Sequence, residues 1–160
     1  MSVLTSRPWC TFRVGDACFA VDSAMVIEVL RDRGLTPVPL AAPGVLGLAH
    51  LRGRIVPVVD PAERLGSNRR TSLARPHLVV ALGDDWYGIL VDEMLDVIEI
   101  HPERIQQPTA IGSRGDVVAG TFAAENQLVH LLEPERMIQS LVRQAVHHAG
   151  RSGESHGGDD

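Results

Sequence analysis

The feature of this sequence that most constrains its fold is an internal repeat, in which the first half of the chain resembles the second. Three pairs of segments and one pair of glycines match: Gly15–Val21 with Gly83–Ile89, Val26–Val29 with Val97–Ile100, Ile55–Pro61 with Leu128–Pro134, and Gly47 with Gly120. The offset rises slowly from 68 to 73 residues, as small loop insertions would make it. Each half has only about 60–65 residues, too few for a generous core of its own. The repeat therefore predicts two similar small units packed together, with a groove between them for a ligand or partner.

Short β-branched runs separated by turn residues predict that these units are β-barrels or sandwiches. Four hairpins are expected: Cys10–Val14 with Ala17–Val21, Val45–Leu51 with Arg54–Val59, Leu78–Leu82 with Trp86–Val91, and Val117–Ala123 with Leu128–Leu132. Because Pro57 lacks an amide donor, its strand should be an edge at that point or carry a bulge. Helical periodicity is confined to three places: Ala24–Leu30, a turn at Ala62–Leu65, and a C-terminal helix from Pro134 to Ala145.

The domain boundaries follow from the same pattern. We expect one pseudo-duplicated domain over residues 8–140, with a first β-barrel half at about 8–66, a second β-barrel half at 77–140 and a polar linker between them. Residues 146–160 are expected to be a disordered tail, since Gly150–Asp160 contains no apolar residue.

The two cysteines lie on either side of a predicted turn at Gly15-Asp16. If Val14 pairs with Ala17, then Phe12 lies opposite Phe19 and Cys10 opposite Val21. Alternation then places Cys10 and Cys18 on opposite faces of the hairpin, which is poor geometry for a disulfide. We therefore expect reduced thiols and a cytoplasmic location, with Cys10 turned inward and slower to react than Cys18.

Composition excludes several classes of function. The net charge is −5, which does not favour binding to nucleic acid or to an anionic membrane. All 15 cationic residues are arginines, so no lysine is present for a nucleotide phosphate or a Schiff base. Aromatic residues make up 4%, too few for a base-stacking surface. No secretory signal is evident at Met1–Arg7, and the apolar runs are too short to cross a bilayer.

The residues that could serve in catalysis or metal binding are expected to have structural roles instead. The histidines His147, His148 and His156 are irregularly spaced near the tail, so no metal site is expected. Four other histidines occur singly and should be structural or on the surface: His50, His77, His101 and His130. Four carboxylates end predicted strands and should cap the turns that follow: Asp22, Asp60, Asp92 and Glu133. We therefore predict no catalytic residue and no cofactor.

One segment is more specific. Leu51–Asp60 resembles the Leu-Arg-Gly hairpin of the CheW-like domain family, the coupling proteins of bacterial chemotaxis arrays. Four further segments resemble family segments in the family's order: Val26–Val29, Ala42–Leu48, Gly88–Asp92, and Gly120 with Leu128–Leu132. The resemblance covers about residues 10–140 and agrees with the internal repeat.

This resemblance implies two intertwined five-stranded β-barrels of SH3-like type in a non-enzymatic adaptor. Members bind the cytoplasmic tip of chemoreceptor helical hairpins and the regulatory domain of a CheA-type histidine kinase. By resemblance, Glu28 and Arg52 form a charged pair beside the receptor groove. Val26, Val29 and Leu46 would line its apolar part. From its position alone, a hairpin-turn arginine such as Arg52 would be expected only to be solvated.

The sequence also departs from the family. His50 stands where the family usually has Asn, and Pro61 where Leu is common. The stretch Gln107–Gly115 is short and lacks an aromatic residue, with Ile111 near its place as the candidate kinase or ring contact. Alternatives are an adaptor specialised for one partner or for a pathway other than flagellar control, and a β-barrel that binds a small ligand. An oligonucleotide-binding barrel is disfavoured by charge and composition.

Overall fold

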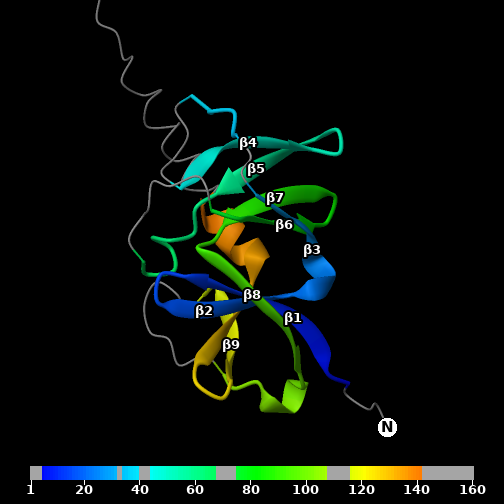
Figure 1. The fold of residues 1–160 in the computed structure, drawn as a ribbon, viewed down its shortest axis with the longest axis vertical. Helices are drawn as coiled ribbons and strands as arrows, with labels where there is room; N and C mark the ends of the chain where they lie inside the picture. Colours follow the sequence, from blue (N-terminus) through cyan, green and yellow to red (C-terminus); the bar gives the residue numbers. More distant parts are fainter. Residues whose placement is uncertain (1–4, 32–33, 40–43, 68–74, 108–115, 142–160) are drawn as a thin grey trace, which may run out of the picture.

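The computed structural model describes residues 5–31, 34–39, 44–67, 75–107 and 116–141, and shows two five-stranded sheets with a C-terminal helix (Figure 1). The strands are β1 (Arg7–Val14), β2 (Ala17–Asp22), β3 (Val26–Leu30), β4 (Val45–Leu51), β5 (Arg54–Val59), β6 (His77–Leu82), β7 (Asp85–Leu90), β8 (Glu93–Ile100), β9 (Val118–Ala123) and β10 (Leu128–Leu132). Short 3₁₀ turns are η1 (Ser23–Met25) and η2 (Pro102–Arg104), and the helix is described over 134–141. The predicted fold class is confirmed.

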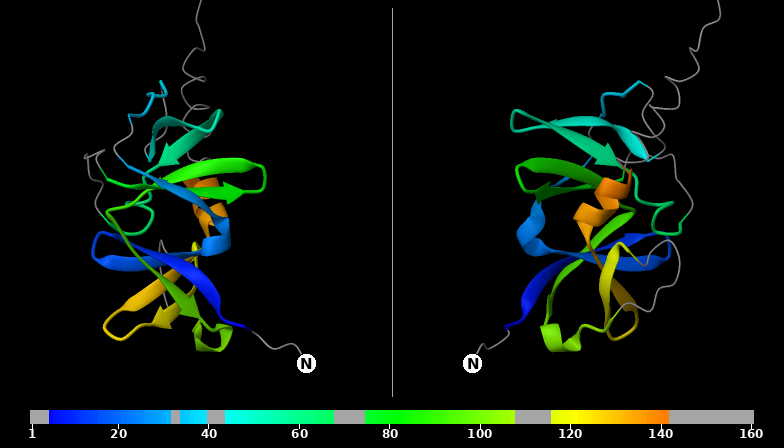
Figure 2. Two further views of the ribbon diagram at one scale, coloured as in Figure 1. Left: turned by 45° about the vertical axis from the view of Figure 1, so that its right-hand side comes forward. Right: turned by 180° about the vertical axis from the view of Figure 1, so that it is seen from behind.

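The two halves of the chain are intertwined through their first hairpins. The lower sheet of Figure 1 has the order β8-β1-β2-β10-β9, and the upper sheet has the order β3-β6-β7-β5-β4. In the internal repeat, strands β1 to β5 match strands β6 to β10 in the same order. Replacing every strand by its match turns the order of one sheet into the order of the other. The parallel pairs β2–β10 and β5–β7 join strands of different halves. Both views of Figure 2 show the blue β1–β2 hairpin beside the yellow strands of the second half. The boundary between the sequence halves is therefore not the boundary between the sheets.

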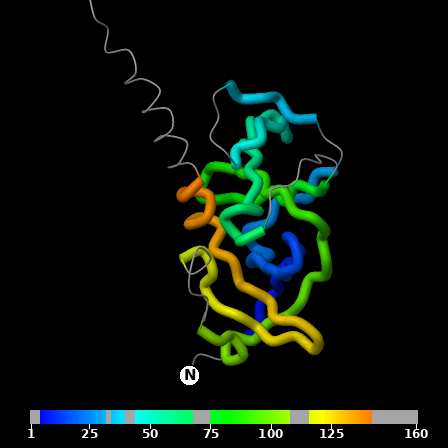
Figure 3. The backbone as a smooth tube through the Cα atoms, turned by 90° about the vertical axis from the view of Figure 1, so that its left-hand side faces the viewer, coloured from blue at the N-terminus to red at the C-terminus, as the bar shows by residue number. Residues whose placement is uncertain are grey.

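Each sheet closes into a barrel through a backbone bridge between its edges. After edge strand β3, Thr36 exchanges two 2.8 Å hydrogen bonds with Leu48 of the opposite edge, β4. After β8, Gln106 does the same with Thr121 of β9, also at 2.8 Å. These return segments lie at opposite ends of the molecule in Figure 3, in cyan and yellow-green.

The matching glycines of the repeat lie beneath these bridges. A Cβ atom on Gly47 would lie 2.6 Å from the carbonyl oxygen of Thr36, and one on Gly120 would lie 2.9 Å from that of Gln106. Both distances are shorter than real Cβ contacts, so any side chain would push the return segment away. Barrel closure explains why the repeat keeps a glycine at both positions.

The predicted hairpins and their register are confirmed. Val14 pairs with Ala17, Phe12 with Phe19, and Cys10 with Val21. The hairpin turn after β6 contains two residues rather than three, because Leu82 pairs with Asp85.

The prediction for Pro57 is correct only in part. Its strand β5 lies between β7 and β4, so it is not an edge strand. The parallel ladder to β7 begins at Val58, just beyond Pro57, and the bulge of this hairpin lies on β4 between Val45 and Gly47. The proline therefore lies beyond the end of that ladder.

The predicted helical piece at Ala24–Leu30 is wrong. It is the single turn η1 followed by strand β3, with the Asp22 carboxylate accepting from the amide of Ala24 at 2.9 Å. Strand β8 is likewise absent from the predicted strands, although Val97–Ile100 matches Val26–Val29 in the repeat. A short apolar run does not distinguish a buried strand from a helix.

The C-terminal helix is confirmed over 134–141, whereas Ile111 and the predicted tail at 146–160 lie outside the described residues.

The apolar side chains form three cores. A lower-barrel core contains Cys18, Ala20, Ile100, Phe122, Val129 and Leu131, and an upper-barrel core contains Leu30, Ala49, Leu51, Val56, Val58 and Val79. The largest is the central core between the sheets, which contains Phe12, Phe19, Leu78, Val80, Ile89 and the helix residues Met137, Ile138 and Leu141 among others. Apolar side chains thus fill much of the space between the barrels, where the repeat predicts a groove.

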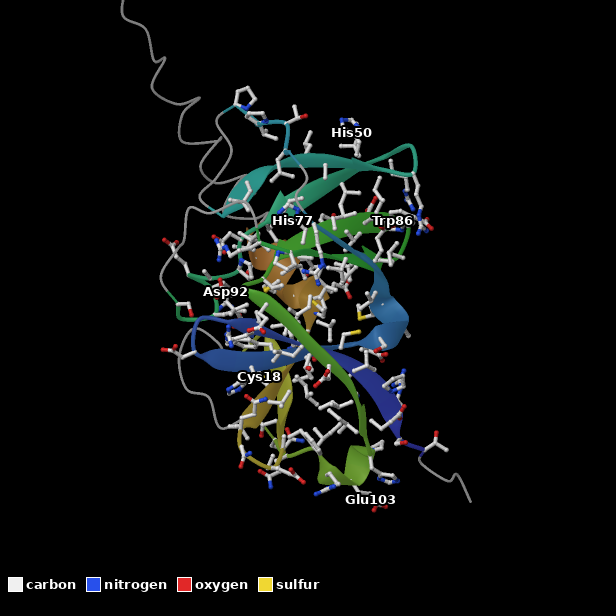
Figure 4. All side chains as sticks on the ribbon, in the orientation of Figure 1. Cys18, His50, His77, Trp86, Asp92 and Glu103 are labelled. Carbon is white, nitrogen blue, oxygen red and sulfur yellow. The ribbon has the colours of Figure 1, made fainter. Side chains whose placement is uncertain are left out.

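The expectation that Cys10 is the better protected thiol is wrong. Cys18, labelled in Figure 4, is only 4% exposed and lies in the lower-barrel core. Cys10 is half-buried, with its Sγ 3.2 Å from the hydroxyl of Ser23. The alternation is correct, but both faces of the hairpin are covered because one faces the barrel interior and the other faces the central core. Both cysteines are free.

We therefore expect Cys10 to be alkylated faster than Cys18. Burial raises the pKa of the Cys18 thiol, partly offset by Arg13, so little reactive thiolate forms there. Mass spectrometry after timed iodoacetamide treatment should show Cys18 labelled roughly ten-fold more slowly than Cys10. In a Cys10→Ser variant, Cys18 is the one remaining cysteine, so this variant should be alkylated slowly. Faster labelling of Cys18 would contradict the burial described here.

His77 is expected to make the free energy of unfolding depend on pH. Its side chain is 1% exposed on β6, and neither ring nitrogen has a hydrogen-bond partner among the described residues (Figure 4). Burial lowers the pKa of His77, and the nearby Arg75 lowers it further. The unfolded chain takes up a proton near the ordinary value of about 6.5, while the folded chain resists it.

The free energy of unfolding should accordingly be unaffected by His77 above neutral pH and should fall as pH drops through about 6.5. One proton contributes at most about 1.4 kcal/mol per pH unit. Urea denaturation at several pH values should show this slope, and a His77→Leu variant should show less of it. An exposed-site control, His50→Gln, should keep the wild-type slope. An unchanged slope in His77→Leu would assign the effect to other groups.

Candidate functional site

The charged pair predicted from the sequence is brought together by the folding of the upper barrel. Arg52 Nη2 lies 3.0 Å from Glu28 Oε1. Glu28 is on edge strand β3, and Arg52 is at the tip of the β4–β5 hairpin, whose strand β4 is the opposite edge. Their side chains are 31% and 62% exposed, so both are accessible to a partner. An exposed ion pair of this kind stabilises a fold by only about 0–1 kcal/mol.

Arg52 has an unusual backbone conformation. Its φ is 51° and that of Gly53 is 76°, the two left-handed conformations of a tight hairpin turn. Among the described residues, Arg52 is the only non-glycine residue with a positive φ. Asn or Gly suits this position, whereas an arginine there costs roughly 1 kcal/mol. Turn chemistry alone therefore does not explain the arginine, and such strain is typical of functional positions.

The second barrel has no counterpart of this ion pair. By the repeat, Glu28 corresponds to Glu99, and Arg52 corresponds to Glu125 in the turn that matches Arg52-Gly53. Two carboxylates cannot form an ion pair. Since the same barrel forms without it, the fold does not require the Glu28–Arg52 pair.

The predicted apolar residues divide between two cores. Val26 and Val29 are partly buried against the central core, and Leu46 is partly buried against the upper-barrel core. Strict alternation would put Val26 and Val29 on opposite faces of β3. A register shift between Val26 and Glu28 in the pairing with β6 reverses the alternation, so both residues face the same core. The structure therefore does not gather the three residues around a single core.

Sequence reasoning missed other residues near this end of the upper sheet. Ile27 packs against the upper-barrel core together with Leu46. The Arg54 guanidinium lies 4.2 Å from the centre of the Trp86 ring and donates to the carbonyl of Asp84. Ile55, next to Arg54, is 61% exposed. Figure 4 labels Trp86 in this region. The signal for the Arg54–Trp86 contact was that Arg54 directly follows one hairpin turn and Trp86 lies one residue further from another.

The strand-ending carboxylates mostly organise the backbone. Asp60 accepts from the amide of Ala62 at 3.0 Å, as Asp22 does at η1. Asp92 accepts from the amide of Gly15 at 2.6 Å and binds Arg75 at 2.5 Å. Predicted capping is confirmed for Asp22 and Asp60. Asp92 instead connects the turn of the β1–β2 hairpin to the segment just before β6. Glu133 pairs with Arg136 at 2.9 Å.

The described residues offer no metal site and no membrane-spanning helix. Within the described ranges, no three His, Cys, Asp or Glu side chains come together in a way that would hold a metal ion. No helix in the same ranges has the length and apolar character needed to cross a membrane. Among the histidines, His130 lies against the Phe19 ring at 5.4 Å, and His101 accepts from the amide of Glu103.

Comparison with known proteins supplies independent information. The sequence profile of the CheW-like domain matches residues 8–142. The chemotaxis protein CheW of Rhizobium meliloti (strain 1021) is 32% identical over 143 residues, covering 88% of this chain and 92% of that protein. The chemotaxis protein CheW of Thermotoga maritima is 27% identical over 132 residues, covering 82% and 87%. The crystal structure of the scaffolding protein TtCheW from Thermoanaerobacter tengcongensis has the same fold, with a TM-score of 0.74 at 24% identity over 80% of this chain and 89% of that chain.

Proposed function

The chain belongs to the CheW-like domain family, and on this premise we propose that it is a non-enzymatic chemosensory adaptor in the cytoplasm. It couples the cytoplasmic tip of a chemoreceptor to the regulatory domain of a CheA-type histidine kinase. The observation that carries this proposal is the Glu28–Arg52 ion pair, which is exposed, strained at Arg52 and absent from the matching position of the second barrel.

The upper barrel supplies the receptor site in this proposal. A receptor tip is a pair of helices, and a helix bound in a groove is held by apolar anchors with flanking charges that fix its register. Val26 and Val29 on β3 and Leu46 on β4 pack against different cores, but each is only partly buried, so each leaves apolar surface for such a helix at the two edges of the upper sheet. Glu28 and Arg52 supply the orienting charges. The kinase contact is assigned to the region of Ile111 by resemblance only.

The proposal is tested by measuring the two partners separately and then together. The purified chain should co-sediment with a receptor cytoplasmic fragment, should bind the isolated regulatory domain of the kinase, and should raise autophosphorylation only when all three proteins are present. Binding to one partner without stimulation would replace the proposal with the specialised adaptor. Failure to bind either partner would overturn it. A pull-down from native cytoplasm identifies the physiological receptor and kinase.

A further inference from the structure

A pocket unrelated to the Glu28–Arg52 pair lies between the lower sheet and the start of the C-terminal helix. Its volume is 570 Å³, within the range of small-molecule sites. Its lining comes from β1, the end of β2, η1, β9, the end of β10 and the helix, and these elements are seen from behind in the right-hand view of Figure 2. None of Val26, Glu28, Val29, Leu46 and Arg52 lines it. The pocket is therefore lined by a different set of residues from the receptor site proposed above, although Met25 directly precedes Val26.

The pocket wall combines apolar surface with negative charge. The lining includes the apolar residues Trp9, Met25 and Leu132. The charged residues among the described lining are Asp22, Glu133, Glu135 and Arg136, three carboxylates and one guanidinium. A tryptophan and carboxylates lining one pocket are a combination suited to organic cations, which are attracted to an aromatic ring by its quadrupole and to carboxylates by charge-assisted hydrogen bonds.

The carboxylates of this wall already bind guanidinium groups within the chain. Asp22 Oδ2 lies 3.0 Å from Nη2 of Arg7, and Glu133 Oε2 lies 2.9 Å from Nε of Arg136. The Arg7 and Arg136 side chains are 61% and 65% exposed, so neither is locked in place by packing. A guanidinium ligand can thus replace Arg136 on Glu133 without moving a buried residue.

We propose that this pocket binds a guanidinium group carried on an apolar stem, with the stem against Trp9 and the charge on Glu133. Arg136 competes for the same carboxylate. Two sources share this chemistry: a free small cation, and an arginine side chain of a partner protein.

The test uses Trp9 as the reporter. The chain has two tryptophans, so a Trp86→Phe background leaves Trp9 as the only one. In this full-length background, butylguanidinium should change the Trp9 fluorescence saturably, and the neutral isostere butylurea should bind at least about five-fold more weakly. Glu133→Gln should weaken butylguanidinium binding about five-fold, whereas Arg136→Gln should tighten it two- to five-fold. If Glu133→Gln and Arg136→Gln acted only by destabilising the helix, both would change the affinity for butylguanidinium in the same direction.

Several outcomes would overturn the proposal: no saturation with butylguanidinium, equal binding of butylurea, or equal affinity in wild type and Glu133→Gln. If Glu133→Gln does not fold, the comparison of butylguanidinium with butylurea and the Arg136→Gln variant decide the proposal with the directions given above. N-acetylarginine methylamide distinguishes the two sources. Binding within about ten-fold of butylguanidinium supports a partner's arginine, since a ten-fold difference is only about 1.4 kcal/mol, and weaker binding supports a free cation.

Discussion

Replacing Arg52 with asparagine is expected to abolish stimulation of the kinase in a reconstituted receptor–kinase assay while leaving the fold at least as stable as wild type. Asparagine suits the left-handed conformation at this turn, so the strain at Arg52 is relieved. The ion pair with Glu28 is lost, but exposed pairs contribute about 1 kcal/mol or less to folding. Receptor affinity should fall by about 2 kcal/mol or more, roughly thirty-fold, as for an orienting arginine in an interface.

The matched control is a second exposed ion pair on the lower sheet. Arg13 and Glu93 lie 2.5 Å apart with side chains 48% and 50% exposed. Arg13→Gln should retain full kinase stimulation and receptor binding, and Glu28→Gln should behave like Arg52→Asn. Normal stimulation in Arg52→Asn would remove Arg52 from the receptor site. A large fall in its melting temperature would make Arg52 a structural residue.

Neither half of the chain is expected to fold alone, although the repeat makes each half look like a unit. The first half lacks β6 and β7, which lie between β3 and β5 in the upper sheet. The second half lacks β1 and β2, which join β8 to β10 in the lower sheet. The central core is divided as well, since Phe12 and Phe19 pack with Leu78 and Val80. Each fragment should lose the whole folding free energy, of the order of 5–15 kcal/mol.

This prediction is checked with fragments 1–70 and 71–160, expressed separately and then mixed. Separately, each fragment should show no cooperative unfolding transition. Mixing the two should restore a cooperative transition, with the melting temperature of the folded protein cut once within 68–74. As a control, the intact protein cut within 68–74 after folding should stay associated. Cooperative unfolding of either fragment alone would show that the sheets do not need strands from both halves.

The local elements of the fold could largely be predicted from the sequence, because they depend on near neighbours. Alternation and turn residues specify the register of Phe12 opposite Phe19 and the hairpin at Arg52-Gly53. The repeat predicts that matching segments of the two halves have the same secondary structure. Short segments beside a bulge were the exception, and β3 was mistaken for a helix because Val26–Leu30 has too few residues for periodicity to decide.

Only the tertiary structure decided which strands meet and which surfaces remain exposed. Exchange of hairpins between the halves depends on non-local pairing, which leaves no trace in the local pattern. Cys18 is buried because the barrel closes over the second face of its hairpin, and alternation gives the face of a residue without saying what covers it. The sequence suggested Glu28 and Arg52 through a family resemblance, but their 3.0 Å contact depends on barrel closure, which brings the two edges of the upper sheet together.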